Sequence, residues 1–290
     1  MKQYIGIDLG GTKIAGVVMD QAHALLHEER VPTPRGYEAI LAAVADMVRR
    51  LWRHAPGAPV GIGAPGSSDR EGLVYNSNTV CFNGRPLRAD LEARLGVPLR
   101  LANDANCLAL SEAVDGAARG AGVVFGVILG TGVGGGVVVN SSLLTGPHGI
   151  AGEWGHNVLE PGGPPCYCGK RGCVETLLSG PGMRADHVRS GGEALDPPAI
   201  VAAAQAGDAL AEACLDRYLD RFARALSVVI NILDPDCIVL GGGLSNMTAL
   251  YDEGAARVRR HVFHPDWRGR IVKSRWGDAS GVRGAAWLWK

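Results

Sequence analysis

The chain has 290 residues, of which 47% are hydrophobic and 20% charged, and this composition predicts a folded protein with substantial cores. Lys plus Arg and Asp plus Glu both number 29, so the formal net charge is zero and the basic surplus of a nucleic-acid-binding protein is absent. The length suggests two domains or one large one.

The first third of the chain alternates predicted strands and helices, as α/β proteins do. Apolar runs predict strands at 4–9, 14–19 and 24–30, with a glycine turn after the first. Apolar residues at helical spacing predict a helix over 37–53. The expected elements that follow are a strand at 60–64, a helix at 87–95, a strand at 99–102 and a helix from residue 106 onward.

The middle of the chain restarts this pattern, with strands expected at 123–129 and 137–140 on either side of a glycine turn. The segments YIGIDLGGTKIAGVVM and VFGVILGTGVGGGVVVN share the order strand, glycine turn, strand. Such a weak repeat favours two related halves, although two unrelated glycine hairpins would look the same.

After residue 173 the chain becomes mostly helical. A long apolar stripe predicts a helix over 209–233, which Asp234 and Pro235 end. The remaining expected elements are a strand at 237–240, a helix at 250–262, a strand at 271–276 and a short helix at 279–289.

Three of the predicted strands end in glycine-rich turns, Gly10-Gly11-Thr12-Lys13, Gly130-Thr131-Gly132 and Gly241-Gly242-Gly243. Glycine lets backbone N–H groups converge on phosphate oxygens, and ligands of α/β proteins bind at the carboxyl ends of strands. One such turn is more often an ordinary tight turn, but three together indicate a phosphate ligand. None matches the P-loop pattern. Asp8 precedes the first turn, where a carboxylate either holds Mg²⁺ through water or braces the turn.

The run Asn103-Asp104-Ala105-Asn106 lies between a predicted strand and a helix. Asp or Asn at a helix start is a normal N-cap, and capping would account for one of these residues. Amides donate and accept hydrogen bonds to sugar hydroxyls, and a carboxylate can take a proton from an attacking hydroxyl. The run therefore suggests a sugar site with a general base.

One histidine and three cysteines, His156, Cys166, Cys168 and Cys173, form a complete four-ligand zinc set. A closed set leaves no position for water, so this zinc is expected to be structural. Glu153 and Glu175 flank the set and are expected on the same wall, the alternative being solvated surface charge. The four remaining cysteines are scattered among apolar residues and are interpreted as reduced core thiols. They favour the cytoplasm, as does the absence of a recognisable signal peptide or 18-residue apolar span.

These motifs resemble those of the ROK family of sugar kinases and repressors. The likeness rests on two stretches, LGTGVGGG at 129–136 through GEWGH at 152–156, and CYCGKRGCVE at 166–175. It implies an actin-like (hexokinase- and ribonuclease H-like) two-domain α/β fold with a zinc knuckle. The expected small domain spans residues 1–117 and is rejoined by the C-terminal helix at 279–290, and the large domain spans 118–278.

The resemblance also implies roles for individual residues. Asp104 is the expected catalytic base. The expected sugar-binding residues are Gly66, Asn78, Asn103, Asp104, Glu153, His156 and Glu175. The expected ATP-binding residues are Gly6, Ile7, Asp8, Leu9, Gly10, Gly11, Thr12, Lys13, Gly130, Thr131, Gly132, Val133, Gly134, Gly135, Gly136, Val137, Gly241, Gly242 and Gly243. Such enzymes use ATP and Mg²⁺, close two lobes over the sugar, phosphorylate its 6-hydroxyl and are commonly homodimers, with no nucleic-acid or membrane partner.

Within the family the likeness favours bacterial fructokinases, also described as mannokinases, over N-acetylglucosamine or N-acetylmannosamine kinases. It rests on LANDANCL at 101–108, NTVCFNG at 78–84 and the tail from Gly277 to Trp289. A sugar-sensing repressor would need an N-terminal helix-turn-helix, for which a strand starting at residue 4 leaves no room. An actin-like assembly protein would have no use for a zinc knuckle beside a sugar site.

Two departures from the family pattern stand out. The hairpin that follows the second glycine loop carries Asn140-Ser141 in place of Asn-Gly, which puts its turn geometry in question. The run between His156 and Cys166 is short and rich in Gly and Pro, and it is expected to influence the choice of sugar.

Overall fold

The computed structural model describes residues 2–69 and 71–290. By compactness the described chain divides into two units. The first holds the residues up to 120 together with 136–151 and 275–290, and the second holds 121–135 and 152–274. No described helix is long and apolar enough to cross a membrane. The predicted domain boundaries at residues 117 and 278 stay a prediction.

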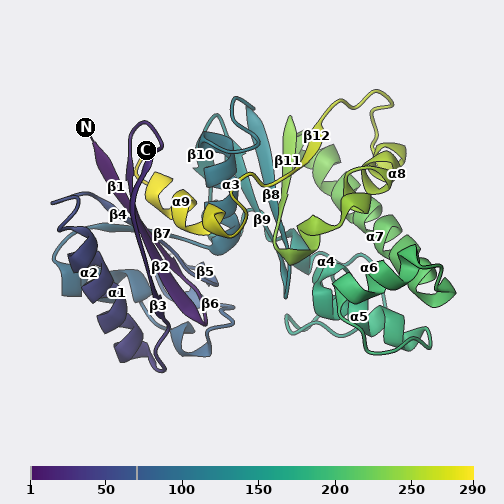
Figure 1. Cartoon of the computed structure of the whole chain (residues 1–290), viewed down its shortest axis with the longest axis horizontal. Helices are drawn as coiled ribbons and strands as arrows, with labels where there is room; N and C mark the ends of the chain where they lie inside the picture. The colour runs from purple at the N-terminus through teal and green to yellow at the C-terminus, as the bar shows by residue number, and fades with distance from the viewer. Residues whose placement is uncertain (1, 70) are drawn as a thin grey trace. The chain divides into compact units, whose positions relative to one another are not determined.

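The first unit is built on a five-stranded sheet with the order β3-β2-β1-β4-β7 (Figure 1). Its strands are β1 (Gln3–Leu9), β2 (Lys13–Asp20), β3 (Leu25–Pro32), β4 (Val60–Gly63) and β7 (Leu99–Ala102). The first three strands pair antiparallel, whereas β1, β4 and β7 run parallel. The carboxyl ends of these three parallel strands therefore meet at one edge, and each leads into a segment predicted to bind ligand.

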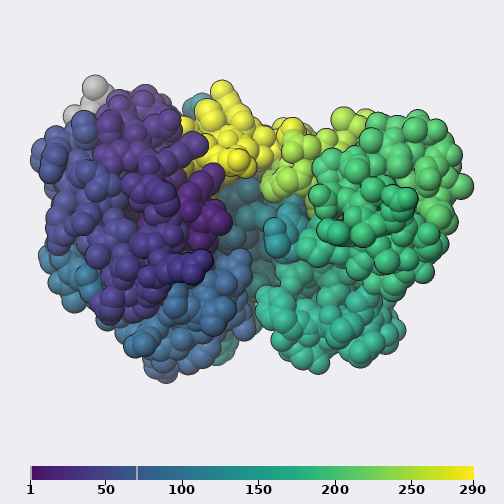
Figure 2. Space-filling model, turned by 60° about the horizontal axis from the view of Figure 1, so that its bottom comes forward, coloured from purple at the N-terminus to yellow at the C-terminus, as the bar shows by residue number. Residues whose placement is uncertain are grey.

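Helices cover both faces of this sheet (Figure 1). They are α1 (Tyr37–Leu51) and α2 (Leu87–Leu95) on one face, and α9 (Ser280–Trp287) on the other, with α3 (Asp104–Val114) packed against α9. Glycine in β1 and β4 permits the close approach of α9, since a Cβ on Gly6 would lie 2.1 Å from the Val282 carbonyl oxygen. Figure 2 shows the yellow C-terminal residues beside the purple N-terminal ones that they cover.

The second sheet has the order β10-β9-β8-β11-β12. Its strands are β8 (Val123–Leu129), β9 (Val133–Val139), β10 (Ser142–Leu144), β11 (Cys237–Gly241) and β12 (Arg270–Lys273). Strand β11 runs parallel to both β8 and β12. The helices of the second unit are α4 (Val174–Leu178), α5 (Gly180–Arg189), α6 (Pro197–Gln205), α7 (Ala209–Leu233) and α8 (Glu253–His261). The half-buried Arg221–Asp186 pair, 2.7 Å apart, joins α7 to α5.

The order of the predicted elements is confirmed, including the full span of α7. The strands β5 (Ser67–Ser68), β6 (Val74–Tyr75) and β10 and the first half of β9 were missed, and α4, α5 and α6 lie in a stretch predicted only as mostly helical. Strand β9 begins at Val133 rather than at residue 137, because its first half consists largely of glycines that an apolar pattern cannot reveal. These glycines serve packing, since a Cβ on Gly136 would lie 2.8 Å from the Ala105 carbonyl oxygen.

The turn between β9 and β10 retains the geometry that Asn-Gly would favour. Asn140 and Ser141 have φ angles of 49° and 62°, so both adopt the left-handed conformation of a type I′ turn. The departure from the family pattern at Ser141 therefore leaves the hairpin intact, at a steric cost that glycine would not incur.

Candidate functional site

The first glycine turn is a tight hairpin between β1 and β2. The Gly10 N–H donates to the Lys13 carbonyl oxygen at 3.0 Å, and the Thr33 hydroxyl donates to the Gly10 carbonyl at 2.7 Å. Gly11, Thr12 and Lys13 are exposed, whereas the preceding Gly6, Ile7 and Leu9 are buried in β1. The buried residues therefore anchor the turn, and the exposed residues are the ones that can contact a ligand directly.

Asp8 lies beside the N-terminal end of α9, where a Cβ on Gly281 would lie 3.3 Å from its carboxylate. Burial, followed by the nearby charge of Asp104, raises the pKa of Asp8 to about 6. Lys13 opposes the shift and Asp278 adds to it. A carboxylate whose pKa is raised by burial and by a neighbouring carboxylate is a natural ligand for a divalent cation, which favours its ionised form.

Helix α3 begins at Asp104, and its cap is Asn103. The Asn103 side chain accepts a hydrogen bond from the Asn106 N–H at 2.7 Å. The capping that could have explained Asp104 is thus performed by its neighbour. The Asp104 carboxylate accepts from the adjacent Ala105 N–H, at 2.9 Å, and from its own backbone N–H. Although the residue is exposed to solvent, desolvation by the protein around it raises the pKa of Asp104 above its ordinary value.

A cavity of about 240 Å³ adjoins the start of α3 within the first unit. Gly66, Asn103 and Asn106 line it, together with residues of the loop at 145–149. Gly66 has a φ of 97°, which glycine adopts without strain. Asn78, also expected to bind sugar, is exposed and does not line this cavity. The sequence had offered no signal for the 145–149 loop.

Asn106 adds a feature that the motif alone had not assigned. Its side-chain oxygen is buried and has no hydrogen-bond partner among the described residues. A buried acceptor without a partner is destabilising, so a hydroxyl donor in the cavity would be bound favourably.

In the second unit, His156, Cys166, Cys168 and Cys173 present their ligand atoms within 4.8 Å of one another. Metal–sulfur bonds of about 2.3 Å and metal–nitrogen bonds of about 2.0–2.1 Å give tetrahedral edges of about 3.8 Å (S–S) and about 3.6 Å (S–N). The Cys168–Cys173 sulfur distance is 3.7 Å, and the Cys166 sulfur lies 3.6 Å from His156 Nδ1. These distances fit a four-coordinate zinc ion.

The remaining ring nitrogen of His156 faces a residue that sequence reasoning missed. His156 Nε2 lies 3.0 Å from the Tyr167 hydroxyl, and the two rings meet edge to face with centroids 5.1 Å apart. If Nδ1 holds the metal, Nε2 carries the proton and donates it to Tyr167. Tyr167 lies between two metal-ligand cysteines in sequence, so spacing gave no reason to single it out.

The two glutamates predicted beside the zinc set both lie close to it in the chain and are half-buried. The Glu175 Oε2 atom accepts from the Val133 N–H at 2.9 Å. Through this bond α4 holds the start of β9, directly after the glycine turn at 130–132. Glu175 thus has a structural role that had not been foreseen, while Glu153 sits at the start of a 3₁₀ turn that ends at His156.

Packing around Trp154 fixes the turn that carries Glu153 and His156. The Trp154 indole N–H donates to the Gly134 carbonyl at 3.0 Å, and its ring meets Phe125 edge to face. A Cβ on Gly155 would lie 2.0 Å from the Val133 carbonyl oxygen, so only glycine fits there. The GEWGH stretch is therefore locked onto β9.

The other two glycine turns also lie at strand ends. The Gly130 N–H donates to the Gly132 carbonyl at 3.0 Å, and Thr131 at its tip is exposed. In the turn after β11, Gly241 is buried, whereas Gly242 and Gly243 are exposed. Gly242 has a φ of 80°, and a Cβ there would lie 2.4 Å from the Leu129 carbonyl oxygen. Along β9, Val133, Gly135, Gly136 and Val137 are buried, and Gly134 is half-buried.

A second grouping of potential ligands, His27, Glu29 and His54, does not have the geometry of a metal site. The two imidazole rings are stacked, 3.8 Å apart and inclined by 17°, so their nitrogen lone pairs run parallel rather than toward one point. Arg50 already pairs with Glu29 at 2.7 Å.

The sequence and the fold are both similar to those of known proteins. The sequence profile of the ROK family matches residues 4–290. The chain is 46% identical to the N-acetyl-D-glucosamine kinase of Citrobacter koseri, with 98% of each chain covered.

Among solved structures, it is similar to a ROK hexokinase from Thermus thermophilus, with 36% identity and a TM-score of 0.90 over 98% of this chain and 97% of the other. It is also similar to a ROK family glucokinase from Streptomyces griseus in complex with glucose and AMPPNP, with 30% identity and a TM-score of 0.80 over 99% and 98%. The chain belongs to the ROK family.

Proposed function

We propose that this protein is an ATP-dependent sugar kinase whose preferred substrate is N-acetylglucosamine. The observation that carries the kinase reaction is the Asp104 carboxylate, which stands at the head of α3 while Asn103 performs the capping. The sugar assignment follows the similarity to N-acetyl-D-glucosamine kinases over nearly the whole chain. The preference for fructose expected from the sequence loses its support, because these relatives carry the name that had been the alternative.

In the proposed reaction, Asp104 accepts the proton of the sugar's primary 6-hydroxyl as its oxygen attacks the γ-phosphorus of ATP. The bond between that phosphorus and the β–γ bridging oxygen breaks, and ADP leaves. The raised pKa of Asp104 suits it to hold a proton at this moment. Asn103 and Asn106 line the cavity that would receive the sugar.

The exposed backbone of the glycine turns is proposed to bind ATP, since N–H groups that converge in such turns favour phosphate oxygens. Mg²⁺, when bound, would neutralise charge on the phosphates, and Asp8 is the proposed carboxylate for it. His156, Cys166, Cys168 and Cys173 would hold a structural zinc ion, which keeps the turn that carries Glu153 in place. With Nδ1 on the metal and Nε2 on Tyr167, His156 would act through this turn rather than by direct contact with the sugar. The cytoplasmic location and the homodimer stay predictions.

The test is ADP release from ATP with a panel of sugars: N-acetylglucosamine, N-acetylmannosamine, glucose, mannose and fructose. We expect the highest kcat/KM with N-acetylglucosamine. A higher value with fructose would return the assignment to the first expectation, and a lack of ADP release with every sugar would refute the kinase.

A further inference from the structure

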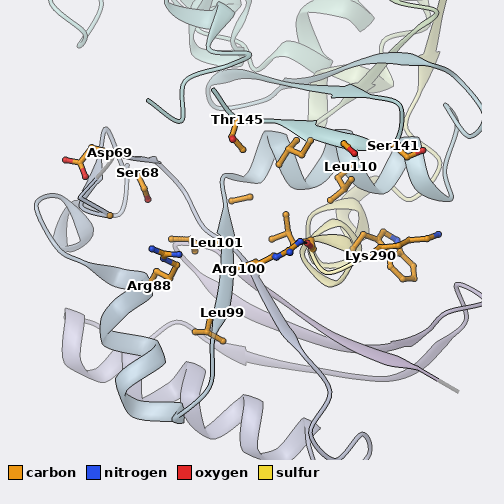
Figure 3. A pocket seen from close by; sticks show the side chains of 16 residues that line it. Ser68, Asp69, Arg88, Leu99, Arg100, Leu101, Leu110, Ser141, Thr145 and Lys290 are labelled. Atoms are coloured by element: carbon orange, nitrogen blue, oxygen red, sulfur yellow. The ribbon is translucent and has the colours of Figure 1, made fainter. Parts of the chain in front are cut away.

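The first unit contains a second, larger cavity of about 480 Å³ (Figure 3). It adjoins the 240 Å³ cavity, and the two have several lining residues in common, which are Ser68, Asp69, Leu101, Ala102 and Thr145. None of the residues proposed for catalysis or for ATP lines the larger cavity. The larger cavity therefore extends beyond the residues proposed for the transfer reaction.

The lining side chains carry an excess of positive charge. Arg88 from α2, Arg100 from β7 and Lys290 from the end of the chain line the cavity, whereas Asp69 is its one acidic side chain among the described residues. Asp69 Oδ1 accepts from the Leu73 N–H at 2.8 Å, and the Lys290 ammonium lies 2.8 Å from His23 Nε2, outside the lining. Two arginines against one carboxylate still leave a positive excess, which favours an anionic ligand.

The arginines differ in how they are held. Arg88 is exposed and makes no ion pair or hydrogen bond with any residue in the described part of the chain. Arg100 donates one N–H to the Leu288 carbonyl and stacks over Trp289 with its guanidinium 4.5 Å from the ring. That bond occupies one of five guanidinium donors and fixes the plane of the others. One arginine is thus preorganised, and the other is available to bind.

Hydroxyl groups complete the polar lining. In Figure 3, Ser141 and Thr145 lie on the wall that faces Arg88 and Arg100. Phosphate oxygens accept readily from both hydroxyl and guanidinium donors. Apolar side chains, Leu101, Leu110 and Trp287 among them, supply surface for the carbon skeleton of a ligand.

We propose that this cavity binds a small organic phosphate, with the phosphate group at Arg88, which has no partner in the described chain, and a polar carbon skeleton, such as a sugar, against the remaining wall. Phosphate monoesters match a guanidinium in shape and charge, and Arg100 adds a second positive charge to the same lining. The volume and the mixed lining favour an organic ester over a free inorganic ion. This inference concerns binding alone and requires no turnover.

The test is titration calorimetry with N-acetylglucosamine 6-phosphate on protein saturated with N-acetylglucosamine and AMPPNP, so that sugar and nucleotide positions are filled. Arg88→Ala should raise the Kd by about tenfold or more, since a charge-assisted pair is lost. The matched control is Arg94→Ala, which removes an exposed arginine from the same helix, where it pairs with Glu38 outside the cavity. Its Kd should stay within about twofold of the unchanged protein.

Three results would overturn the proposal. They are no heat of binding for N-acetylglucosamine 6-phosphate when N-acetylglucosamine and AMPPNP are bound, an unchanged Kd in Arg88→Ala, or inorganic phosphate binding as tightly as the ester. Arg88→Glu serves as a second variant and should abolish binding, while melting curves confirm that each variant is folded. Arg88→Ala should leave the rate of sugar phosphorylation unchanged when no sugar phosphate is added. Because the readout is heat of binding, failure of the kinase assignment would leave the dependence on Arg88 measurable.

Discussion

Single residues decide the chemistry at the head of α3. The sequence showed four candidate groups in a row but could not say which of them caps the helix. The structure assigns the cap to Asn103 and leaves the Asp104 carboxylate with local backbone bonds, from the N–H groups of Ala105 and of Asp104 itself. Which of two adjacent side chains turns back onto the backbone depends on local dihedral angles, and these are not encoded in residue type alone.

Asp104→Asn should therefore lower kcat by at least about 10²-fold, because the amide cannot accept the proton, while helix stability stays nearly unchanged. Single-turnover measurements with N-acetylglucosamine would give the rate, and calorimetry would give the Kd of the sugar. Asn103→Ala is the contrasting variant, since it removes the cap and should destabilise the protein by about 1 kcal/mol. Equal turnover in Asp104→Asn and the unchanged protein would remove Asp104 from its role.

Tyr167 makes the second residue-scale prediction. Its hydroxyl is the partner of His156 Nε2, so Tyr167→Phe should loosen the histidine and weaken zinc binding by about 10-fold or more. The measurement is competition for zinc with a chromogenic chelator, which needs no catalytic turnover. Tyr75→Phe, an exposed tyrosine far along the chain in the other unit, is the control. An unchanged zinc affinity in Tyr167→Phe would show that the contact does not support the metal site.

At the scale of elements, strands and helices with a clear apolar period were predictable, and those made of small residues were not. The apolar stripe of α7 predicted the full length of the helix, whereas the first half of β9, which is rich in glycine, had no apolar pattern from which to predict it. The same limit applied to the site. Motif residues contiguous in sequence were found, but the loop at 145–149 lines its cavity through a contact distant in sequence, in which Gly149 lies against the Ser68 carbonyl.

The β9–β10 turn carries a prediction about stability. Ser141 holds a φ of 62° that glycine adopts without steric cost, so Ser141→Gly should stabilise the protein by about 0.5–1 kcal/mol. Urea unfolding would measure it, with Ser142→Gly in the adjacent strand as a control expected to destabilise. A loss of stability in Ser141→Gly would show that the Ser141 side chain stabilises the fold by more than its left-handed backbone conformation costs.

At the scale of the whole molecule, one buried carboxylate joins distant parts of the chain. Glu112 is fully buried near the end of α3 and accepts from the backbone N–H groups of Ala117, Arg275 and Trp276 and from the Ser280 hydroxyl, at 2.8–3.1 Å. The segment from residue 275 onward thereby returns to the first unit. Glu112→Ala should cost about 3–5 kcal/mol, because four donors lose their acceptor. Thermal unfolding would show it, and Glu92→Ala on α2 is a milder comparison with one such bond.

The paired carboxylates predict how activity of the whole enzyme depends on pH. Burial and the charge of Asp104 raise the pKa of Asp8 to about 6, and desolvation raises the pKa of Asp104 above its ordinary value. A carboxylate with a raised pKa becomes protonated at a higher pH, so the proposed Mg²⁺ ligand Asp8 loses its charge as the pH falls through about 6, and the proposed base Asp104 also loses its charge at a higher pH than an ordinary aspartate would. The kcat/KM for N-acetylglucosamine should thus fall on the acidic side of that value. In Asp8→Asn the carboxylate with a pKa of about 6 is gone, so activity should drop and the acidic limb that remains should reflect Asp104 alone. A pH profile of the unchanged protein that stays flat down to pH 5 would contradict a role for Asp8 in its ionised form.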